Sequence, residues 1–364
     1  LSSGEAFPIT DGRSQVWSPD WSPDGQALYY VSNRGGSMDL WGQPIGDDGR
    51  PTGDPERLSA GLVIRAAAFS QDGKQLAYSR GKRMSNLWRV PLLTDRPATW
   101  ADAEQLTFDQ ALIDSVDVSP DGQRLLFNSD RSGNQDLWMM PSTGGEVRQL
   151  TTEPLPDWAP MWSPDGNNIA FYSYRSGNRD IWVMPVSGGA ARQVTRDETQ
   201  EAWPAWSPDG RELAFDSVRG GNRDIWVIPV EGGEARRVTE HSDTDRSPVW
   251  SPDGKWLGFR SSRSGQIRLW RVPATGGEPE KIGAGSGTFR WSLDGKRIYS
   301  RGEGERVGSI WELSLDNGDE RPITDLVGKR GTLGGDALAT DGEHLYFTWA
   351  EDVGDLWVMD VVRE

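Results

Sequence analysis

Apolar and polar residues alternate over short stretches along the whole chain, and the same stretch recurs eight times. Residues 162–195 run through Trp-Ser-Pro-Asp-Gly, an apolar segment, Ser-x-Arg-x-Gly, Asp-Ile-Trp-Val, a Gly-Gly pair and a closing Val-Thr. The Asp-Gly pair returns at steps of 41 to 49 residues, at Asp24, Asp72, Asp121, Asp165, Asp209, Asp253, Asp294 and Asp341. A period in the forties that is built from short alternating segments is typical of a four-stranded propeller blade.

One repeat predicts four strands separated by turns. Ser163-Pro164-Asp165-Gly166 is turn chemistry, since Pro presets its φ and Gly accepts a positive φ. Strands are expected before this turn and at residues 168–173, 180–184 and 191–195. Helices are not expected, because Gly and Pro interrupt every dozen residues and no segment keeps apolar residues at three-and-four spacing.

The ends of the chain predict how the ring closes. The last repeat stops after its third strand at residues 355–359, while residues 4–10 resemble a fourth strand such as residues 233–239. We therefore expect the N-terminal strand to complete the last blade. The predicted fold is an all-β, eight-bladed β-propeller of four-stranded antiparallel blades, formed as one domain over residues 1–364. Seven blades are the alternative if the degraded signature at residues 339–342 does not form a blade.

Composition excludes several partners. The 364 residues carry a net charge of −16 and no cysteine, and no stretch gathers Lys and Arg as a nucleic-acid surface requires. No apolar run approaches the roughly 18 residues of a membrane span, so neither nucleic acid binding nor membrane insertion is expected. The start at Leu1-Ser2-Ser3 suggests a processed protein or an excised domain.

The Ser-Pro-Asp-Gly and Asp-Ile-Trp motifs resemble the TolB-type propeller repeat, a WD-like blade, over essentially the whole chain. The motif is intact near Trp21, Val118, Trp162 and Trp206, and it is degraded at Gln71, Leu293 and Thr340. The resemblance implies a soluble periplasmic TolB-like protein, a substrate-gating propeller of a tricorn-like or prolyl-oligopeptidase-like peptidase, or a sensor domain of a bacterial multidomain protein. The orderly array is most similar to the sensor group. Because many propellers that resemble this one are extracytoplasmic, we expect the protein outside the cytoplasm, in the periplasm.

Two recurring features have structural interpretations. A column of tryptophans is expected to pack between blades, because it is filled in every repeat: Trp41, Trp88, Trp138, Trp182, Trp226, Trp270, Trp311 and Trp357. The tryptophans ahead of the Asp-Gly turn have the same interpretation. The arginine of Ser-x-Arg is expected to pair with the aspartate of Asp-Ile-Trp, as in Arg175 with Asp180, and so to clamp the loop between the second and third strands.

Departures from the repeat mark the candidate site. The segment that enters each innermost strand is expected to reach a central funnel, and it varies while its frame stays fixed. Acidic and aromatic groups around one mouth would suit a cation, an amine or a basic peptide end; the alternative is a solvated rim without a ligand. The predicted ligand-binding residues are Trp17, Arg65, Asp114, Asp157, Trp158, Glu201, Trp203, Asp245 and Arg246.

Catalytic motifs are absent from the sequence: there is no G-x-S-x-G, no H-E-x-x-H and no cysteine. We therefore predict a non-catalytic propeller, without metal or cofactor, that binds a protein, a peptide or a small cationic ligand. It is expected to be a monomeric sensor or scaffold domain of a larger bacterial protein. The alternatives are the peptidase gate named above and a polysaccharide lyase, against which the acidic residues Asp157, Glu201 and Asp245 argue.

Overall fold

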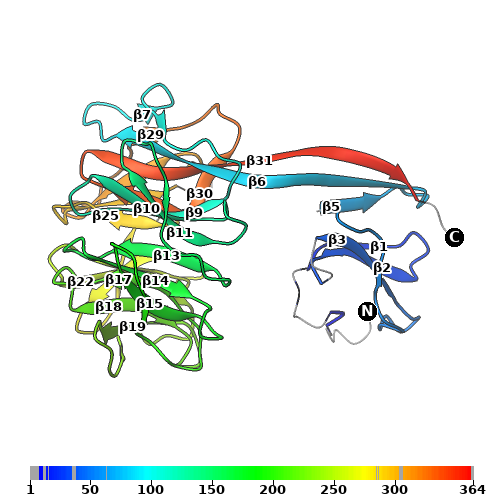
Figure 1. Ribbon diagram of the computed structural model, residues 1–364, viewed down its shortest axis with the longest axis horizontal. Helices are drawn as coiled ribbons and strands as arrows, with labels where there is room; N and C mark the ends of the chain where they lie inside the picture. The colour runs from blue at the N-terminus through cyan, green and yellow to red at the C-terminus, as the bar shows by residue number, and fades with distance from the viewer. Residues whose placement is uncertain are drawn as a thin grey trace. The chain divides into compact units, whose positions relative to one another are not determined.

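The chain forms two compact units. The computed structural model describes residues 8–10, 14, 16–34, 38–62, 64–283, 285, 287–302 and 306–361. Leu1–Arg83 together with Asp352–Glu364 make one unit, here the small unit, and Met84–Glu351 make the other, here the ring unit. The regular elements of the described residues are β-strands (Figure 1), which confirms the predicted all-β class. No helix in this part of the chain has the length and apolar character needed to cross a membrane.

Five repeats of the ring unit each form a four-stranded antiparallel sheet whose strands follow chain order. The short fourth strand is the outer edge of each sheet, as the polar fourth segment of the repeat predicts. The strands are β9 (Ile113–Val118), β10 (Arg124–Ser129), β11 (Asp136–Pro141) and β12 (Arg148–Gln149); β13 (Asp157–Trp162), β14 (Asn168–Ser173), β15 (Asp180–Pro185) and β16 (Arg192–Gln193); β17 (Glu201–Trp206), β18 (Glu212–Ser217), β19 (Asp224–Pro229) and β20 (Arg236–Arg237); β21 (Asp245–Trp250), β22 (Trp256–Ser261), β23 (Arg268–Pro273) and β24 (Glu280–Gly283); and β25 (Phe289–Trp291), β26 (Arg297–Arg301), β27 (Ile310–Ser314) and β28 (Glu320–Pro322).

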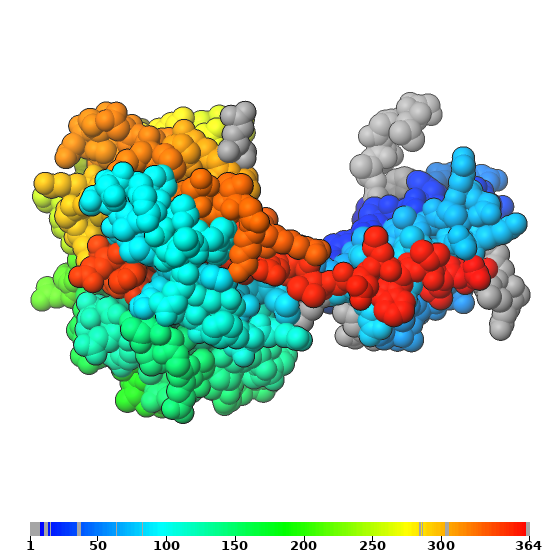
Figure 2. Space-filling model, turned by 90° about the horizontal axis from the view of Figure 1, so that it is seen from above, coloured from blue at the N-terminus to red at the C-terminus, as the bar shows by residue number. Residues whose placement is uncertain are grey.

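A sixth sheet closes the ring with strands from both ends of the unit. Its first two strands are β30 (Thr332–Thr340) and the start of β31 (His344–Asp360), and the end of β6 (Gln75–Pro91) and β8 (Glu104–Gln105) follow. Figure 2 shows the first segment of the ring unit, in cyan, and its last segment, in orange to red, side by side. The first strands contact one another in a closed cycle, with β30 between β25 and β9. A short parallel pair, β7 (Ala98–Thr99) with β29 (Thr324–Asp325), lies beside this closure.

The predicted number of blades is not confirmed. The ring unit closes with six sheets, whereas the first repeat and the first half of the second belong to the small unit. Of the predicted closing strand at residues 4–10, residues 4–7 lie outside the described residues and residues 8–10 form no strand. The closing strands come instead from β6 and β8, because residues 86–88 repeat the Leu-Trp pattern of residues 355–357 and fit the same place beside β31. The structure divides into two compact units, and the single domain predicted for residues 1–364 stays a prediction.

The small unit holds the first sheet and part of a second. β1 (Val16–Trp21), β2 (Ala27–Ser32), β3 (Asp39–Pro44) and β4 (Glu56–Arg57) form one antiparallel sheet, and β5 (Ile64–Phe69) pairs with the start of β6. Val31, Leu40, Ile64, Leu76 and Tyr78 form its buried cluster. The end of β31 runs beside β6 with an exposed outer surface, seen in red in Figure 2, on which Leu356 is 83% exposed.

Tryptophans connect neighbouring blades of the ring. Trp162, Trp206, Trp250 and Trp291 are buried, as the packing interpretation predicts. The indole nitrogen of Trp206 donates to the carbonyl oxygen of Met161 in the preceding blade, and that of Trp250 donates in the same way to Ala205, both at 3.2 Å. Each of these bonds joins adjacent first strands and thereby fixes their spacing around the ring. In the small unit, by contrast, the equivalent Trp21 is 54% exposed and Trp357 of the other column is 48% exposed.

The paired long strands predict a strong effect of one small substitution. β6 and β31 run unbroken through the points where the repeat predicts hairpin turns, and at these points Gly81 and Gly354 lie against each other's backbone. A Cβ on Gly354 would lie 2.7 Å from the Cα of Gly81, so Gly354→Ala is expected to cost about 1–3 kcal/mol in thermal or urea unfolding. Gly53→Ala, which adds a Cβ in open space, is the matched control. Equal stability of the two variants would show that β6 and β31 are not paired here in solution.

The Asp-Gly turns predict an acid-sensitive contribution to stability. The Ser292 hydroxyl donates to Asp294 at 2.5 Å and the backbone N–H of Lys296 at 3.1 Å, and these bonds lower the pKa of Asp294 to about 2. Because the folded state favours the ionised form, this stabilisation is complete above the unfolded pKa of about 4 and is lost as pH falls toward about 2.

Asp294→Asn should therefore lower the unfolding midpoint at neutral pH by about 2 °C, and the difference from the wild type should vanish at about pH 2. Glu234→Gln, at an exposed carboxylate, is the control. A difference that is constant over this pH range would contradict the assigned role of Asp294.

Candidate functional site

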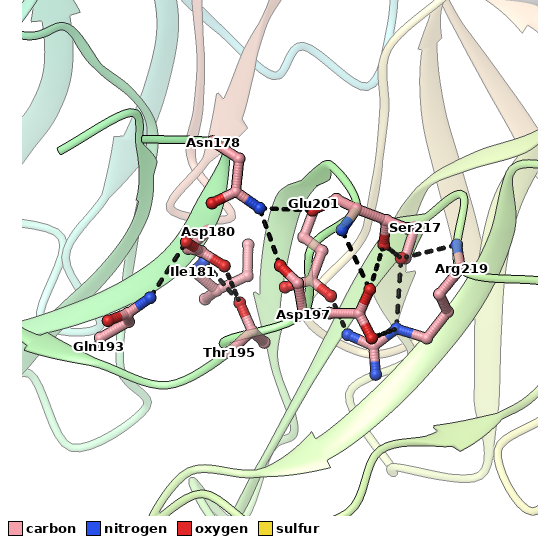
Figure 3. A network of polar contacts seen from close by, with 10 residues as sticks. Asn178, Asp180, Ile181, Gln193, Thr195, Asp197, Glu201, Ser217 and Arg219 are labelled. Atoms are coloured by element: carbon pink, nitrogen blue, oxygen red, sulfur yellow. Dashed lines mark hydrogen bonds and ion pairs between the residues drawn. The ribbon is translucent and has the colours of Figure 1, made fainter. Parts of the chain in front are cut away.

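An arginine in the loop after the second strand holds the start of the first strand in three blades. Arg175 donates through Nη2 to both carboxylate oxygens of Asp157, at 2.8 and 2.7 Å. Arg219 pairs with Glu201, as Figure 3 shows, and Arg263 pairs with Asp245 at 2.6 Å. All three carboxylates are fully buried. A buried carboxylate needs such a partner, so the pair fixes the first residue of each first strand.

The clamp predicted between Arg175 and Asp180 is wrong in its pairing. Asp180 instead accepts hydrogen bonds from Ser176, Gln193 and Thr195, and Figure 3 shows the last two contacts. Burial raises the pKa of Asp180. Strand register does not distinguish the two aspartates, because Ser173 lies opposite both Asp157 and Asp180. The difference is that neighbouring side chains already occupy the Asp180 carboxylate, so the loop arginine pairs with the first strand.

The same arginines cover aromatic rings. The guanidinium carbon of Arg175 lies 5.2 Å from the ring centres of both Phe171 and Trp182, and Arg219 lies in the same way over Phe215 and Trp226. A cation over a ring face is stabilised by the ring quadrupole. The tryptophan column therefore packs under arginines at one end of the blades, and this packing supports the loops around the first strands.

A narrow channel runs between the first strands and is lined by all six blades of the ring. Its wall is formed by residues within the third to fifth positions of β9, β13, β17, β21 and β30, by residues 288–290 at the start of β25, and by one residue of a second strand. The lining residues are Ser115, Val116, Ala159, Pro160, Met161, Trp203, Pro204, Ser247, Pro248, Val249, Arg260, Thr288, Phe289, Arg290 and Asp336. Because every blade contributes, the channel exists only in the closed ring.

Three residues of the wall hold a left-handed backbone conformation. Ala159, Trp203 and Ser247 have φ values of 49°, 57° and 54°. Each lies where the pairing of the first and second strands shifts register, and a proline follows each of them. Non-glycine residues in this region cost about 1–3 kcal/mol each and persist where the surrounding structure enforces them, often at binding sites.

One second strand also contributes a side chain to the channel. The fifth residue of the second strands changes from blade to blade, and Arg260 of this set lines the channel: Asn128, Tyr172, Asp216, Arg260, Arg301 and Thr348. The rings of Tyr172 and Trp203 meet edge to face at 6.1 Å. Asp216 pairs with Arg223 and accepts a hydrogen bond from the backbone N–H of Ser247 at 3.0 Å, and burial raises its pKa.

The structure separates the predicted site residues into groups. Trp17 and Arg65 lie in the small unit, where Arg65 pairs with Asp352. Asp157, Glu201 and Asp245 are buried in their arginine pairs, and Trp158 lines a separate apolar surface hollow with Tyr172 and Tyr174. Of the nine predicted residues, Trp203 lines the channel, while Asp114 and Arg246 lie on the strands that form it. The ligand-binding role of the set stays a prediction.

The sequence-based count stopped before the channel wall. Apart from Trp203, it selected the first or second residue of the first strands, whereas the channel is lined by the positions that follow them. The signal that could have located them is the proline inside these strands, at Pro160, Pro204 and Pro248, because proline within a sheet marks a bulge or an edge. Among the described residues, no group of three or more His, Cys, Asp or Glu is placed to hold a metal ion.

A closed ring of radial four-stranded sheets around a channel defines a β-propeller. The model of the TolB beta propeller domain matches residues 59–204 and 160–361, so the chain belongs to that family.

Individual relatives cover smaller parts of the sequence. The Tol-Pal system protein TolB of Anaeromyxobacter dehalogenans is 30% identical over 122 residues, which is 33% of this chain and 24% of that protein. An uncharacterized protein of Agrobacterium fabrum is 34% identical over 142 residues, 38% of this chain and 44% of that protein. The chain thus spans less than half the length of these curated relatives.

Solved structures share the fold. A putative TolB from Agrobacterium tumefaciens superimposes with a TM-score of 0.63 at 24% identity, over 75% of this chain and 100% of that chain. TolB from Acinetobacter baumannii gives a TM-score of 0.54 at 15% identity, over 94% of this chain and 80% of that chain. At these identities the likeness supports the propeller fold.

The arginine clamp predicts a large effect on stability. Arg175→Ala leaves the Asp157 carboxylate buried without its cation, and about 3–5 kcal/mol of unfolding free energy should be lost in urea denaturation. Lys255→Ala removes an exposed pair, in which both side chains are more than half exposed, and should cost less than about 1 kcal/mol. Equal losses in the two variants would contradict a structural role for the clamp.

Proposed function

We propose that this chain is a non-catalytic binding module whose ring unit takes a protein, a peptide or a small ligand at its central channel. The observation that carries the proposal is the channel itself, to which all six blades contribute side chains. Its wall includes three residues in left-handed backbone conformations, which are common at preorganised sites. Convergent polar groups in an otherwise apolar concavity are what a ligand site requires.

The family relation supports a role in protein assembly. A TolB relative is named as a protein of the Tol-Pal system, and by analogy we infer that this chain binds a protein partner outside the cytoplasm. By analogy with the sensor propellers that the repeat resembles, we infer that the chain acts as a monomeric sensor or scaffold domain of a larger bacterial protein. The small cationic ligand is the least favoured occupant, because arginines, and not free carboxylates, dominate the channel.

One specific observation supports a second candidate function, that of a polysaccharide lyase. The acidic residues that argue against a lyase are neutralised by arginines, and Arg260 and Arg290 line the channel. A polysaccharide lyase acting on an acidic polymer would use such a channel. Incubation with a polyuronate, followed through the ultraviolet absorbance of an unsaturated product, separates the two functions: product formation that needs Arg290 would replace the binding proposal.

The binding proposal is tested with a thermal-shift screen of peptides, small cations and small carboxylates on the whole chain. Trp203→Ala removes an aromatic wall of the channel and should weaken the affinity of any hit at least tenfold, because a buried aromatic contact is worth about 2 kcal/mol or more. Trp256→Ala, which removes the same residue type outside the channel, is the control. Hits that Trp203→Ala leaves unchanged would place binding elsewhere and overturn the proposed site.

A further inference from the structure

Arginines outnumber their counter-ions around the channel. Arg260 forms an ion pair with Asp336 at 3.1 Å, and Arg223 pairs with Asp216. Within the described residues, no carboxylate lies within 4 Å of the guanidinium nitrogens of Arg246, Arg290 or Arg301. In a chain with a net charge of −16, this local surplus of positive charge identifies the channel as the place where an anion would be attracted.

Arg260 is a buried cation with hydrogen-bonding capacity left over. Arg260 is 7% exposed. Its Nη2 donates to the Ser247 hydroxyl at 2.7 Å and to Asp336 at 3.1 Å. Its Nε is buried and has no partner. A guanidinium carries five N–H donors, so some donors of Arg260 have no acceptor.

Arg290 has even fewer polar partners than Arg260. Its Nη1 donates to the backbone oxygen of Phe289 at 2.9 Å, its Nη2 lies 3.9 Å from the sulfur of Met161, and its Nε is buried without a partner. The carboxylates that act on it electrostatically are Asp117 and Asp336. Neither forms an ion pair with it, since Asp117 accepts the backbone N–H of Trp162 at 2.8 Å and Asp336 is bonded to Arg260.

We propose that the channel binds a carboxylate group, which Arg260 and Arg290 hold. Planar guanidinium groups bind planar carboxylates through parallel N–H donors, and an unsatisfied buried donor is costly until an acceptor arrives. Arg260, Arg290 and Asp336 together leave one positive charge, which a monovalent carboxylate balances. Pro160, Pro204 and Pro248 offer no backbone N–H and give the narrow channel an apolar wall for the carbon chain behind the carboxylate.

This inference rests on the proposed binding function and names the ligand chemistry of the same site. The carboxylate comes either from a small organic acid or from an acidic side chain of a partner protein. Three probes distinguish these sources at constant ionic strength: sodium succinate, an end-capped tetraglutamate peptide, and the matching tetraglutamine peptide. Binding of succinate indicates a small-molecule site, whereas binding of tetraglutamate alone indicates a protein partner.

Arg290→Met keeps an unbranched side chain similar to the stem of arginine and removes the guanidinium group with its charge. Calorimetric titration of the whole chain should show binding of one carboxylate probe, about ten- to a hundredfold weaker in Arg290→Met, because a hydrogen bond between charged groups is lost. Arg192→Gln, at an exposed arginine of an outer strand, should bind as the wild type does. Free of ligand, Arg290→Met should be at least as thermally stable as the wild type, since an unsatisfied buried charge has been removed.

Arg260→Gln provides a second variant at the other guanidinium and should weaken the same probe by a similar factor. Equal binding of tetraglutamine and tetraglutamate, or carboxylate affinities that neither variant changes, would overturn the proposal. If no carboxylate binds while another hit of the screen depends on Trp203, the binding function stands and the carboxylate inference fails.

Discussion

The closure of the ring by strands from its two sequence ends is the constraint on which the other features depend. β30 and the start of β31 supply the first half of the sixth sheet, and the end of β6 with β8 supplies the second half. Without this pairing the two terminal sheets would expose open edges, and the first strands would not form a cycle. The channel has a wall on every side only because this sheet places Asp336 opposite the other blades.

Within the ring, polar pairs act at the loop end of the blades and tryptophans act along their length. The pair of Arg175 with Asp157, and its equivalents, fixes where each first strand starts. The indole bonds of Trp206 and Trp250 fix the distance between adjacent first strands. With both ends of the strand held, the residues between them can keep the left-handed backbone of Ala159, Trp203 and Ser247, which would otherwise relax.

The charge of the channel depends on which of these residues are already paired. Asp157, Glu201 and Asp245 of the first strands are paired in the clamp, whereas Arg260 and Arg290 are placed where the fold offers few acceptors. A predominantly acidic protein thus encloses a channel with unpaired cationic donors. The same arrangement reverses the ligand preference suggested by the sequence, from a cation toward an anion, since the carboxylates that would attract a cation are already neutralised.

The sequence by itself determined the repeat, its four strands and its turns, because alternation with period two and Ser-Pro-Asp-Gly chemistry are local properties. It also identified the tryptophans ahead of the Asp-Gly turn as packing residues, and those of the ring, Trp162, Trp206, Trp250 and Trp291, are buried. The equivalent Trp21 of the small unit is exposed, so the repeat alone does not decide burial. Pairing partners were decided by tertiary structure. Arg175 meets Asp157 and not Asp180, although Ser173 lies opposite both, because hydrogen bonds from neighbouring side chains already occupy the Asp180 carboxylate. Likewise, residues 86–91 and 355–359 carry equivalent patterns, and only long-range strand pairing selects which of them completes the last sheet of the ring.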